Sequence, residues 1–185
     1  MNAIKFFLEG MKRFKTVGAV AATSKFTSKN MVKYMNFDTA ECLVELGAGD
    51  GSITKYILQK MRPETKLICF EINELLIAEL RKTVADDPRV TIIQDDAAKL
   101  GEYIEAAGFE QVDGVISAIP FVIIPTDEII EQSYKYMKKG TKYVQLHYST
   151  AAKKRYQRIF GNVAIDFVML NMPPAFLHIC EKKED

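Results

Sequence analysis

Short apolar runs alternate with helix-patterned segments along most of the chain. Seven runs have the length and composition of strands: residues 42–46, 66–72, 90–93, 112–119, 142–148, 163–170 and 175–180. Between the first five, apolar residues recur at helical spacing over residues 51–61, 73–85, 97–107 and 126–138. Strands separated by helices of this length build a parallel sheet with helices on both faces, so the pattern predicts an α/β fold.

The last two runs break this alternation. Only a short stretch containing Asn171, Pro173 and Pro174 separates them, which leaves no room for a helix. Two strands joined so tightly pair antiparallel. We therefore predict a mostly parallel seven-stranded sheet that ends in an antiparallel C-terminal hairpin. Without an internal repeat or a low-complexity linker, the chain is expected to form one domain over residues 1–185, with its core in residues 41–185.

The N-terminal segment, residues 1–36, has a different character. Apolar residues recur at helical spacing in its first half, and most of the lysines there lie off that stripe. The segment carries seven basic side chains and one acidic side chain, a net charge of +6, which leaves −5 for the rest of a chain of net charge +1. Such a basic amphipathic helix either lies in a membrane interface or packs on the domain, and the pattern allows both.

The composition narrows the class of protein. Apolar residues make up 48% and charged residues 26%, as in globular proteins and unlike disordered or fibrous ones. The three cysteines form no CxxC pair, so we expect neither a disulfide framework nor a metal site. No run approaches the roughly 18 apolar residues of a membrane span, and no signal peptide is recognisable. We expect a cytoplasmic protein, and its small net charge gives no reason to expect DNA as a partner.

The candidate chemistry begins where the first predicted strand ends. Residues 42–52 read Cys-Leu-Val-Glu-Leu-Gly-Ala-Gly-Asp-Gly-Ser, and such glycines let a backbone turn sharply and approach a ligand beside helix N–H groups. Glu71 ends the second strand, where a carboxylate can accept both hydroxyls of a ribose. Asp96 and Ala97 follow the third strand. Because the carboxyl ends of neighbouring strands meet at one edge, the three turns predict a nucleotide-like site.

These motifs resemble those of class I S-adenosylmethionine-dependent methyltransferases, whereas dehydrogenases more often carry GxGxxG. The resemblance implies a Rossmann-like fold with S-adenosylmethionine as the cofactor. It also implies that the glycine loop lies against methionine and ribose, that Glu71 holds the ribose, and that Asp96 and Ala97 flank the adenine. The expected cofactor contacts are Glu45, Gly47, Ala48, Gly49, Gly51, Ser52, Glu71, Ile72, Asp96, Ala97, Ser117, Thr23 and Ser24.

Further blocks are similar to bacterial phospholipid N-methyltransferases, over about residues 6–182. They are Phe7-Leu8, the Gly-Ala-Val-Ala-Ala-Thr-Ser block that ends at Ser24, Ser117-Ala-Ile-Pro120 and Asn171-Met-Pro-Pro-Ala175. This similarity implies methylation of a lipid amine, as in phosphatidylethanolamine, and peripheral contact with an anionic membrane. The rRNA adenine dimethylases carry Asn-Leu/Ile-Pro-Tyr instead, and this chain has one extra residue between Ser117 and Ile-Pro. An adenine in RNA, a small-molecule amine, or cofactor binding without catalysis are the alternatives.

We expect Tyr148 and Ser117 to be catalytic. Tyr148 ends the fifth predicted strand at the ligand edge, where the resemblance also places an aromatic ring, and aromatic faces hold ammonium groups. An aminolipid nitrogen must lose a proton before attack, and a nearby tyrosine, histidine or carboxylate can relay it. His147 and His178 are interpreted as packed strand residues. Tyr34 is interpreted as a residue that packs in the core, with an aromatic contact to the acceptor as the less favoured alternative.

Several polar residues have a structural interpretation beside the functional one. Asp96 also fits a helix N-cap, and Asp95 is expected to be a pure cap or a solvated acid. Asn171 is expected to stabilise its turn, with the acceptor pocket as the alternative. The basic residues after the fifth strand either bind a phosphate headgroup or line a solvated helix face; they are Lys153, Lys154, Arg155 and Arg158.

Overall fold

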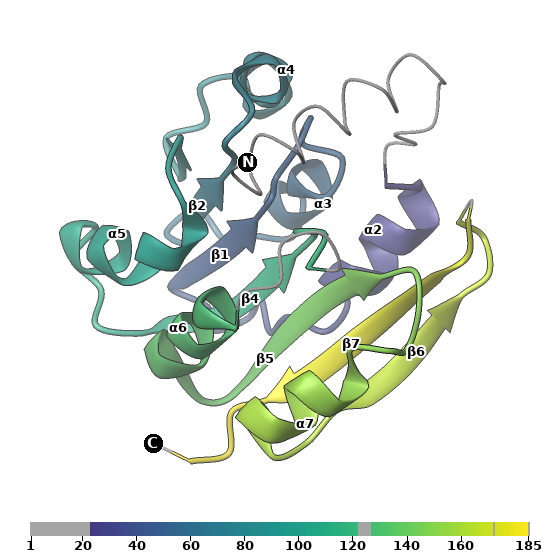
Figure 1. The fold of residues 1–185 in the computed structure, drawn as a ribbon. Coiled ribbons are helices and arrows are strands. Elements are labelled where there is room, and N and C mark those ends of the chain that lie inside the picture. The colour runs from purple at the N-terminus through teal and green to yellow at the C-terminus, as the bar shows by residue number, and fades with distance from the viewer. Residues whose placement is uncertain (1–22, 122–126, 172, 185) are drawn as a thin grey trace, which may run out of the picture.

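A computed structural model describes residues 23–121, 127–171 and 173–184 of the chain. They contain a seven-stranded sheet with the order β3-β2-β1-β4-β5-β7-β6 (Figure 1). The strands are β1 (Cys42–Leu46), β2 (Lys66–Phe70), β3 (Val90–Ile93), β4 (Val112–Ser117), β5 (Met137–His147), β6 (Ala164–Val168) and β7 (Ala175–Glu181). Neighbours pair in parallel from β3 to β5, and β7 pairs antiparallel with both β5 and β6. The predicted mostly parallel sheet with its C-terminal hairpin is confirmed.

Helices cover both faces of this sheet (Figure 1). One face carries α2, α3 and α4, and the other carries the 3₁₀ turn η1 with α5, α6 and α7. Their bounds are α2 (Lys25–Val32), α3 (Thr54–Leu58), α4 (Glu74–Val84), η1 (Ala97–Lys99), α5 (Leu100–Ala106), α6 (Glu128–Tyr136) and α7 (Lys153–Phe160).

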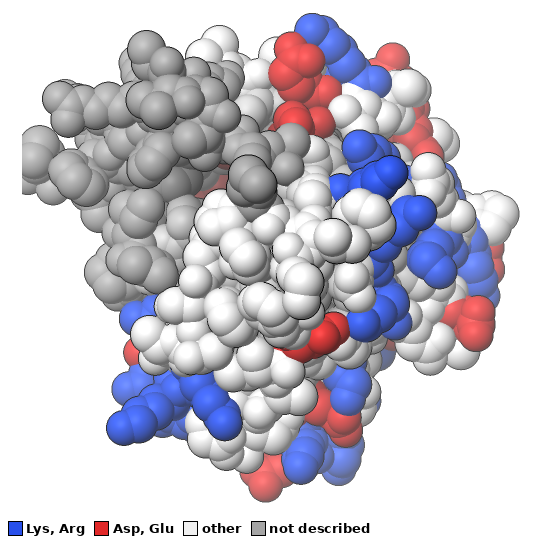
Figure 2. Space-filling model, turned by 90° about the vertical axis from the view of Figure 1, so that its right-hand side faces the viewer, with Lys and Arg blue, Asp and Glu red and all other residues white. Residues whose placement is uncertain are grey.

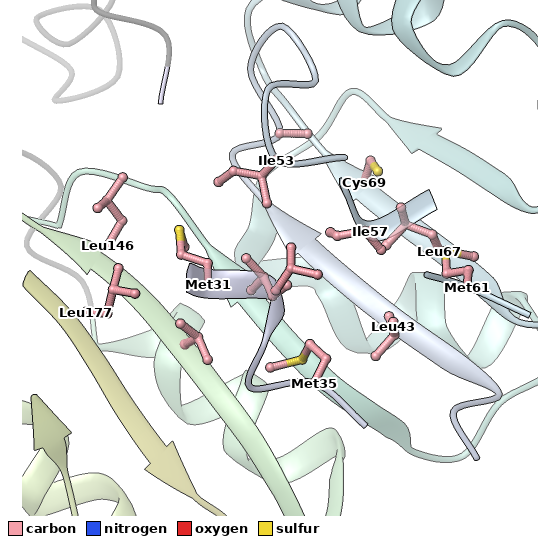
Figure 3. Packing of buried hydrophobic residues seen from close by; sticks show 14 of the residues in the cluster. Met31, Met35, Leu43, Ile53, Ile57, Met61, Leu67, Cys69, Leu146 and Leu177 are labelled. Carbon is pink, nitrogen blue, oxygen red and sulfur yellow. The ribbon is translucent and has the colours of Figure 1, made fainter. Parts of the chain in front are cut away.

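Side chains of β1 alternate between the two faces of the sheet, and both faces contribute to the hydrophobic core. Leu43 points to the α2–α4 side, whereas Val44 and Leu46 point to the α5–α7 side. Figure 3 shows the first of these layers, in which Met31 of α2 and Ile57 of α3 pack over the sheet. Each such fully buried side chain contributes roughly 1.5–3 kcal/mol. The central strands are buried on both sides, which is why their sequences read as nearly continuous apolar runs.

Strand β5 begins at Met137, earlier than the predicted 142. The prediction missed residues 137–141 because their sequence lacks the alternation typical of a strand. Met137 pairs with Val112, but Lys142 already pairs with Gly114, so the strand bulges between them. Gly140 lies in this bulge with a φ of +80°. Lysines at 138 and 139 give the segment a polar sequence, and no period-two alternation is left to recognise.

The predicted N-terminal amphipathic helix, together with Phe7-Leu8 and most of the Gly18–Ser24 block, lies outside the described residues. The part of the basic segment that is described contains α2. Within residues 23–121, 127–171 and 173–184, no helix has the length and apolar character needed to cross a membrane.

Candidate functional site

The glycine loop is fastened to the end of β2. The backbone N–H groups of Gly47 and Ala48 both donate to the carbonyl of Phe70, at 2.8 and 3.0 Å. Gly49 has a φ of +60°, and no described atom lies within 4 Å of the position a Cβ would take. Its α-carbon therefore faces open space, as a close ligand approach requires. The loop leads into α3, as the sequence predicts.

Glu71 links the glycine loop to the end of β2. Its Oε2 accepts from the N–H of Gly49 at 2.9 Å, and its Oε1 accepts from the N–H of Asn73 at 2.8 Å. The side chain is 7% exposed, and burial raises its pKa above the usual value. Each oxygen keeps a second lone pair for another donor. Ile72 lies between Glu71 and Asn73, half-buried at the same edge.

Glu45 is the last acid before the loop and is fully buried. Its Oε2 accepts from the hydroxyl of Thr54 at 2.7 Å, and the thiol of Cys69 lies 3.6 Å from the same oxygen. Its Oε1 has no partner among the described residues. Burial raises the pKa of Glu45 to about 8, so the carboxyl is largely neutral at pH 7 unless a cation approaches it.

The two acids after β3 have different surroundings. Asp96 accepts from the N–H of Ala98 at 2.9 Å and caps η1, as expected, while its side chain stays exposed. Asp95 is a partly exposed acid, one of the two roles expected for it, and its side chain has partners of its own. Its carboxylate accepts from the hydroxyl of Tyr103 at 2.8 Å and pairs with Lys99 at 3.0 Å. Those hydrogen bonds, from Tyr103 first and Lys99 next, lower the pKa of Asp95 to about 2.

The turn after β4 packs on the glycine loop. A Cβ on Gly47 would lie 3.1 Å from Cγ1 of Ile119 and 3.2 Å from its N. Ser117 is fully buried, and its Oγ accepts from the N–H of Ile119 at 3.4 Å. The hydroxyl of Ser117 therefore holds the turn in the described conformation, and it is not presented at the surface.

Gln145 is a residue of this site that the sequence interpretation missed. It is fully buried in β5, and its Nε2 donates to the carbonyl of Ile119 at 2.9 Å. Its Oε1 accepts from the hydroxyl of Tyr143 at 3.0 Å. The sequence feature that could have identified Gln145 is a single amide side chain within an apolar strand. A buried amide requires hydrogen-bond partners, so its presence there indicates a specific contact. Gln145 thus holds Ile119 against Gly47.

Thr23 and Ser24 lie at the start of α2, beside the turn between β6 and β7. The Ser24 Oγ caps α2 through the N–H of Thr27 at 3.2 Å and donates to the carbonyl of Leu170 at 3.0 Å. Asn171 Oδ1 accepts from the N–H of Ser24 and the hydroxyl of Thr27, and its Nδ2 donates to the carbonyl of Pro173. The turn role expected of Asn171 is confirmed, and the structure adds its bonds to α2. The sequence block that ends at Ser24 and the block that begins at Asn171 are thus joined by hydrogen bonds, although these two residues are 147 positions apart.

The aromatic and histidine candidates separate into exposed and buried groups. Tyr148 follows β5 and is 53% exposed at the carboxyl edge. His147 and His178 are buried, as expected, with ring centroids 4.7 Å apart. His147 Nε2 lies 2.9 Å from the hydroxyl of Tyr156, and burial lowers the pKa of both imidazoles to about 4. These rings are therefore neutral core residues at pH 7.

Two further expectations concern charged surroundings. Tyr34 packs partly against the core, as expected, and its hydroxyl donates to Asp166 at 2.7 Å. The basic residues of α7 do not form an open row, because Arg155 and Arg158 both pair with Asp127. Lys153, Lys154 and Arg158 are exposed, as a solvated helix face requires, whereas Arg155 is partly buried.

Taken together, the carboxyl edge gathers an open glycine loop, a buried carboxylate with spare acceptor capacity and the Ile119 turn. These groups suit a ligand with hydroxyls and a cationic group. Ser24, Thr27 and Asn171, which bond the start of α2 to the β6–β7 turn, form a second cluster on the same edge. Tyr148, at the end of β5, lies at this edge too.

Comparisons with known proteins point in one direction. Residues 43–140 match the family described as "Methyltransferase domain". The chain is 28% identical over 181 residues to an ornithine lipid N-methyltransferase of Singulisphaera acidiphila, covering 95% of this chain and 92% of that protein. It is 24% identical to an rRNA methyltransferase of Streptomyces thermotolerans, over 81% of this chain but 47% of that protein. In fold it is similar to the O-methyltransferase TomG of Streptomyces achromogenes, solved with S-adenosylmethionine (TM-score 0.68, 13% identity, 84% and 79% coverage).

Proposed function

The chain belongs to the methyltransferase domain family and is an S-adenosylmethionine-dependent methyltransferase, and from this premise we propose that it methylates the amine of a lipid headgroup. One observation carries the proposal. The match to the ornithine lipid N-methyltransferase spans nearly the whole of both chains, so it includes the acceptor side as well as the cofactor side. Ornithine lipids and phosphatidylethanolamine both carry a primary amine and are the acceptors to test.

The described residues fit the cofactor. Gly49 leaves open space where a side chain would obstruct a ligand, and Glu71 has lone pairs for two ribose hydroxyls. Glu45 remains a predicted cofactor contact, although its side chain is fully buried and bonded to Thr54 beneath the loop. When bound, the cofactor supplies an electrophilic methyl group on a sulfonium. Asp96 and Ala97, at the end of β3, complete the proposed site on the adenine side.

The work of the protein is then to deliver an unprotonated amine in line with that methyl group. Aminolipids carry ammonium groups near pH 7, so a proton must leave first. Tyr148 is an exposed aromatic at this edge, directly after β5, and we assign it the role of holding the headgroup nitrogen by its ring face. His147 does not suit the role of base, because it is buried against Tyr156 with a low pKa. Water is the proton acceptor in this proposal.

The roles of the other predicted residues follow from their contacts. Ser117 is assigned to positioning the Ile119 turn, since its hydroxyl is buried there. Thr23 and Ser24, which are expected to contact the cofactor, lie at the start of α2, where Ser24 bonds to the β6–β7 turn. Ala48, Ser52 and Ile72 contribute to the walls of the cofactor site.

An adenine in RNA is the second candidate, because an rRNA methyltransferase matches 81% of the chain. The chain spans about half the length of that relative, 47%, so the match leaves half of the relative without a counterpart. The lipid acceptor is preferred because its relative is matched over 92% of its length.

The test is methyl transfer from radiolabelled S-adenosylmethionine to detergent-dispersed phosphatidylethanolamine, ornithine lipid or a structured RNA. We expect label in the lipid fraction, and label in RNA alone would contradict the proposal. Tyr148→Ala is expected to reduce lipid methylation at least tenfold while the affinity for S-adenosylmethionine stays unchanged. Tyr148→Phe, which keeps the ring face, is the matched control and should retain most of the activity.

A further inference from the structure

Four exposed apolar side chains lie at the start of α2 and around the β6–β7 turn. They are Phe26, Phe167, Met169 and Leu170, between 42% and 71% exposed, and we refer to them as the turn patch. They make up four of the six large apolar side chains that the described residues expose. The bond from Ser24 to the carbonyl of Leu170 holds the start of α2 against the turn. Phe167 stacks on Phe176 of β7 at 5.1 Å, which fixes its ring at the hairpin edge.

The charge around the turn patch is mainly positive, and the nearby Asp166 is paired with Lys33 at 2.9 Å. Residues 23–37 and 167–180 contain no Asp or Glu, whereas α2 carries lysines at 25 and 29. The ammonium of Lys25 lies 5.2 Å from the ring centroid of Phe26, and Lys29 follows one helical turn later on an exposed position. Figure 2 shows this side of the molecule, where an uncharged surface is bordered by lysine and arginine side chains and by a smaller number of acidic ones.

The turn patch lies on the same edge as the cofactor loop. Strands β5 and β6 run in the same direction, because both pair antiparallel with β7. The end of β6 therefore points to the edge where β1, β2 and β4 end. The turn patch, the Gly47–Gly51 loop and Tyr148 therefore lie along one edge of the sheet.

We propose that the turn patch inserts into the interfacial layer of an anionic bilayer, with Lys25 and Lys29 at the lipid phosphates. Apolar side chains next to lysines are the composition of interfacial membrane anchors, whereas lysine is depleted in interfaces between proteins. The insertion holds the carboxyl edge at the depth of the headgroups. The proposed function supplies the amine acceptor, so the orientation of the carboxyl edge toward the headgroups rests on that function. The docking of the turn patch does not depend on it.

Flotation of the full chain with vesicles of phosphatidylglycerol and phosphatidylcholine tests the docking. Leu170→Asp and Phe26→Ser are expected to weaken binding at least tenfold, because each removes apolar contact and the first adds repulsion. Leu75→Asp, at a leucine on α4 that is 63% exposed, is the matched control and should bind like the wild type. All of these positions are exposed, and a melting curve confirms that each variant folds. Added salt should weaken the binding of the wild type.

Methyl transfer to a dispersed short-chain aminolipid separates this proposal from the proposed function. Docking predicts that Leu170→Asp keeps that transfer and loses transfer to vesicles. Unchanged vesicle binding by Leu170→Asp and Phe26→Ser would overturn the docking and leave the function standing. Lost vesicle binding in a chain that methylates no lipid amine would support the docking and overturn the function. A concentration-dependent dimer that Leu170→Asp abolishes, without vesicle binding, would mark the patch as a self-association surface and overturn the docking.

Discussion

Gly49 and Gly51 have similar backbone conformations but different surroundings, which separates ligand binding from folding at the level of single residues. Both have a positive φ, +60° and +86°. No described atom would contact a Cβ on Gly49, whereas a Cβ on Gly51 would lie 2.6 Å from Cγ2 of Thr83. The first glycine is therefore required by the ligand and the second by the packing of the loop on α4.

Gly49→Ala is expected to cost about 1 kcal/mol of stability and to weaken S-adenosylmethionine binding at least tenfold, since its Cβ enters the ligand space. Gly51→Ala should instead lose roughly 2–4 kcal/mol from strain and overpacking. Gly161→Ala, at a φ of +68° with no described atom within 4 Å, is the control. It should match Gly49→Ala in urea unfolding and leave ligand affinity intact. Equal affinities by calorimetry for all three variants would contradict this assignment.

Gln145 acts at a distance from the ligand, through Ile119. Gln145→Leu is expected to cost roughly 1–3 kcal/mol, because it leaves the Ile119 carbonyl without its donor, and to weaken S-adenosylmethionine binding several-fold. Ser133→Ala is the control, since it removes another buried bond, 2.7 Å to the carbonyl of Ile129, away from the site. It should lower stability without changing affinity. If Gln145→Leu also left affinity unchanged, Gln145 would not position the Ile119 turn.

At the level of helices and strands, the strands could be predicted from the sequence. The hydrogen bonds between residues far apart in the chain could not. The apolar runs located β1, β3 and β7 within one residue. β1 and β7 are buried over most of their length, whereas β3 is a half-buried edge strand made of β-branched residues. The glycine loop and Glu71 followed from local motifs at strand ends. The bonds from Asn171 to α2 could not be read in this way, since they join residues 144 and 147 positions apart. Nor could the bulge at the start of β5, where the spacing of side chains changes.

Asn171 gives a prediction for how α2 is held. Asn171→Ala is expected to destabilise the chain by roughly 2–3 kcal/mol, because it removes three hydrogen bonds of a buried amide. Asn171→Asp keeps the acceptor for Ser24 and Thr27 and loses only the donor to Pro173, so it should recover part of that loss. Urea unfolding measures both. An Asn171→Asp variant no more stable than Asn171→Ala would show that the bonds to α2 contribute little.

For the whole molecule, the buried imidazoles make stability depend on acid. His147 and His178 have pKa values near 4 when folded, against about 6.5 in an unfolded chain. Between those values the unfolded chain takes up protons that the folded chain excludes, so stability falls as the pH is lowered through this window. The raised pKa of Glu45 works in the opposite direction over pH 4.5–8, so a comparison of variants is needed.

His178→Phe isolates the contribution of one imidazole. From pH 7 to pH 5 the wild type should lose about 2 kcal/mol more stability than this variant, because the phenyl ring does not titrate. Leu177→Val, a buried neighbour without a titrating group, is the control and should lower stability equally at both pH values. Urea midpoints at the two pH values give the answer. Parallel acid losses in the wild type and His178→Phe would exclude His178 as a source of the acid dependence.

The position of β7 between β5 and β6 has a consequence for how the protein is made. Among the described strands, β6 pairs only with β7. A growing polypeptide therefore carries β6 without a strand partner until β7 has left the ribosome. Its native sheet closes only after synthesis reaches β7. A polypeptide that stops shortly before Ala175 would thus be susceptible to proteolysis, because it lacks β7 and leaves β6 unpaired.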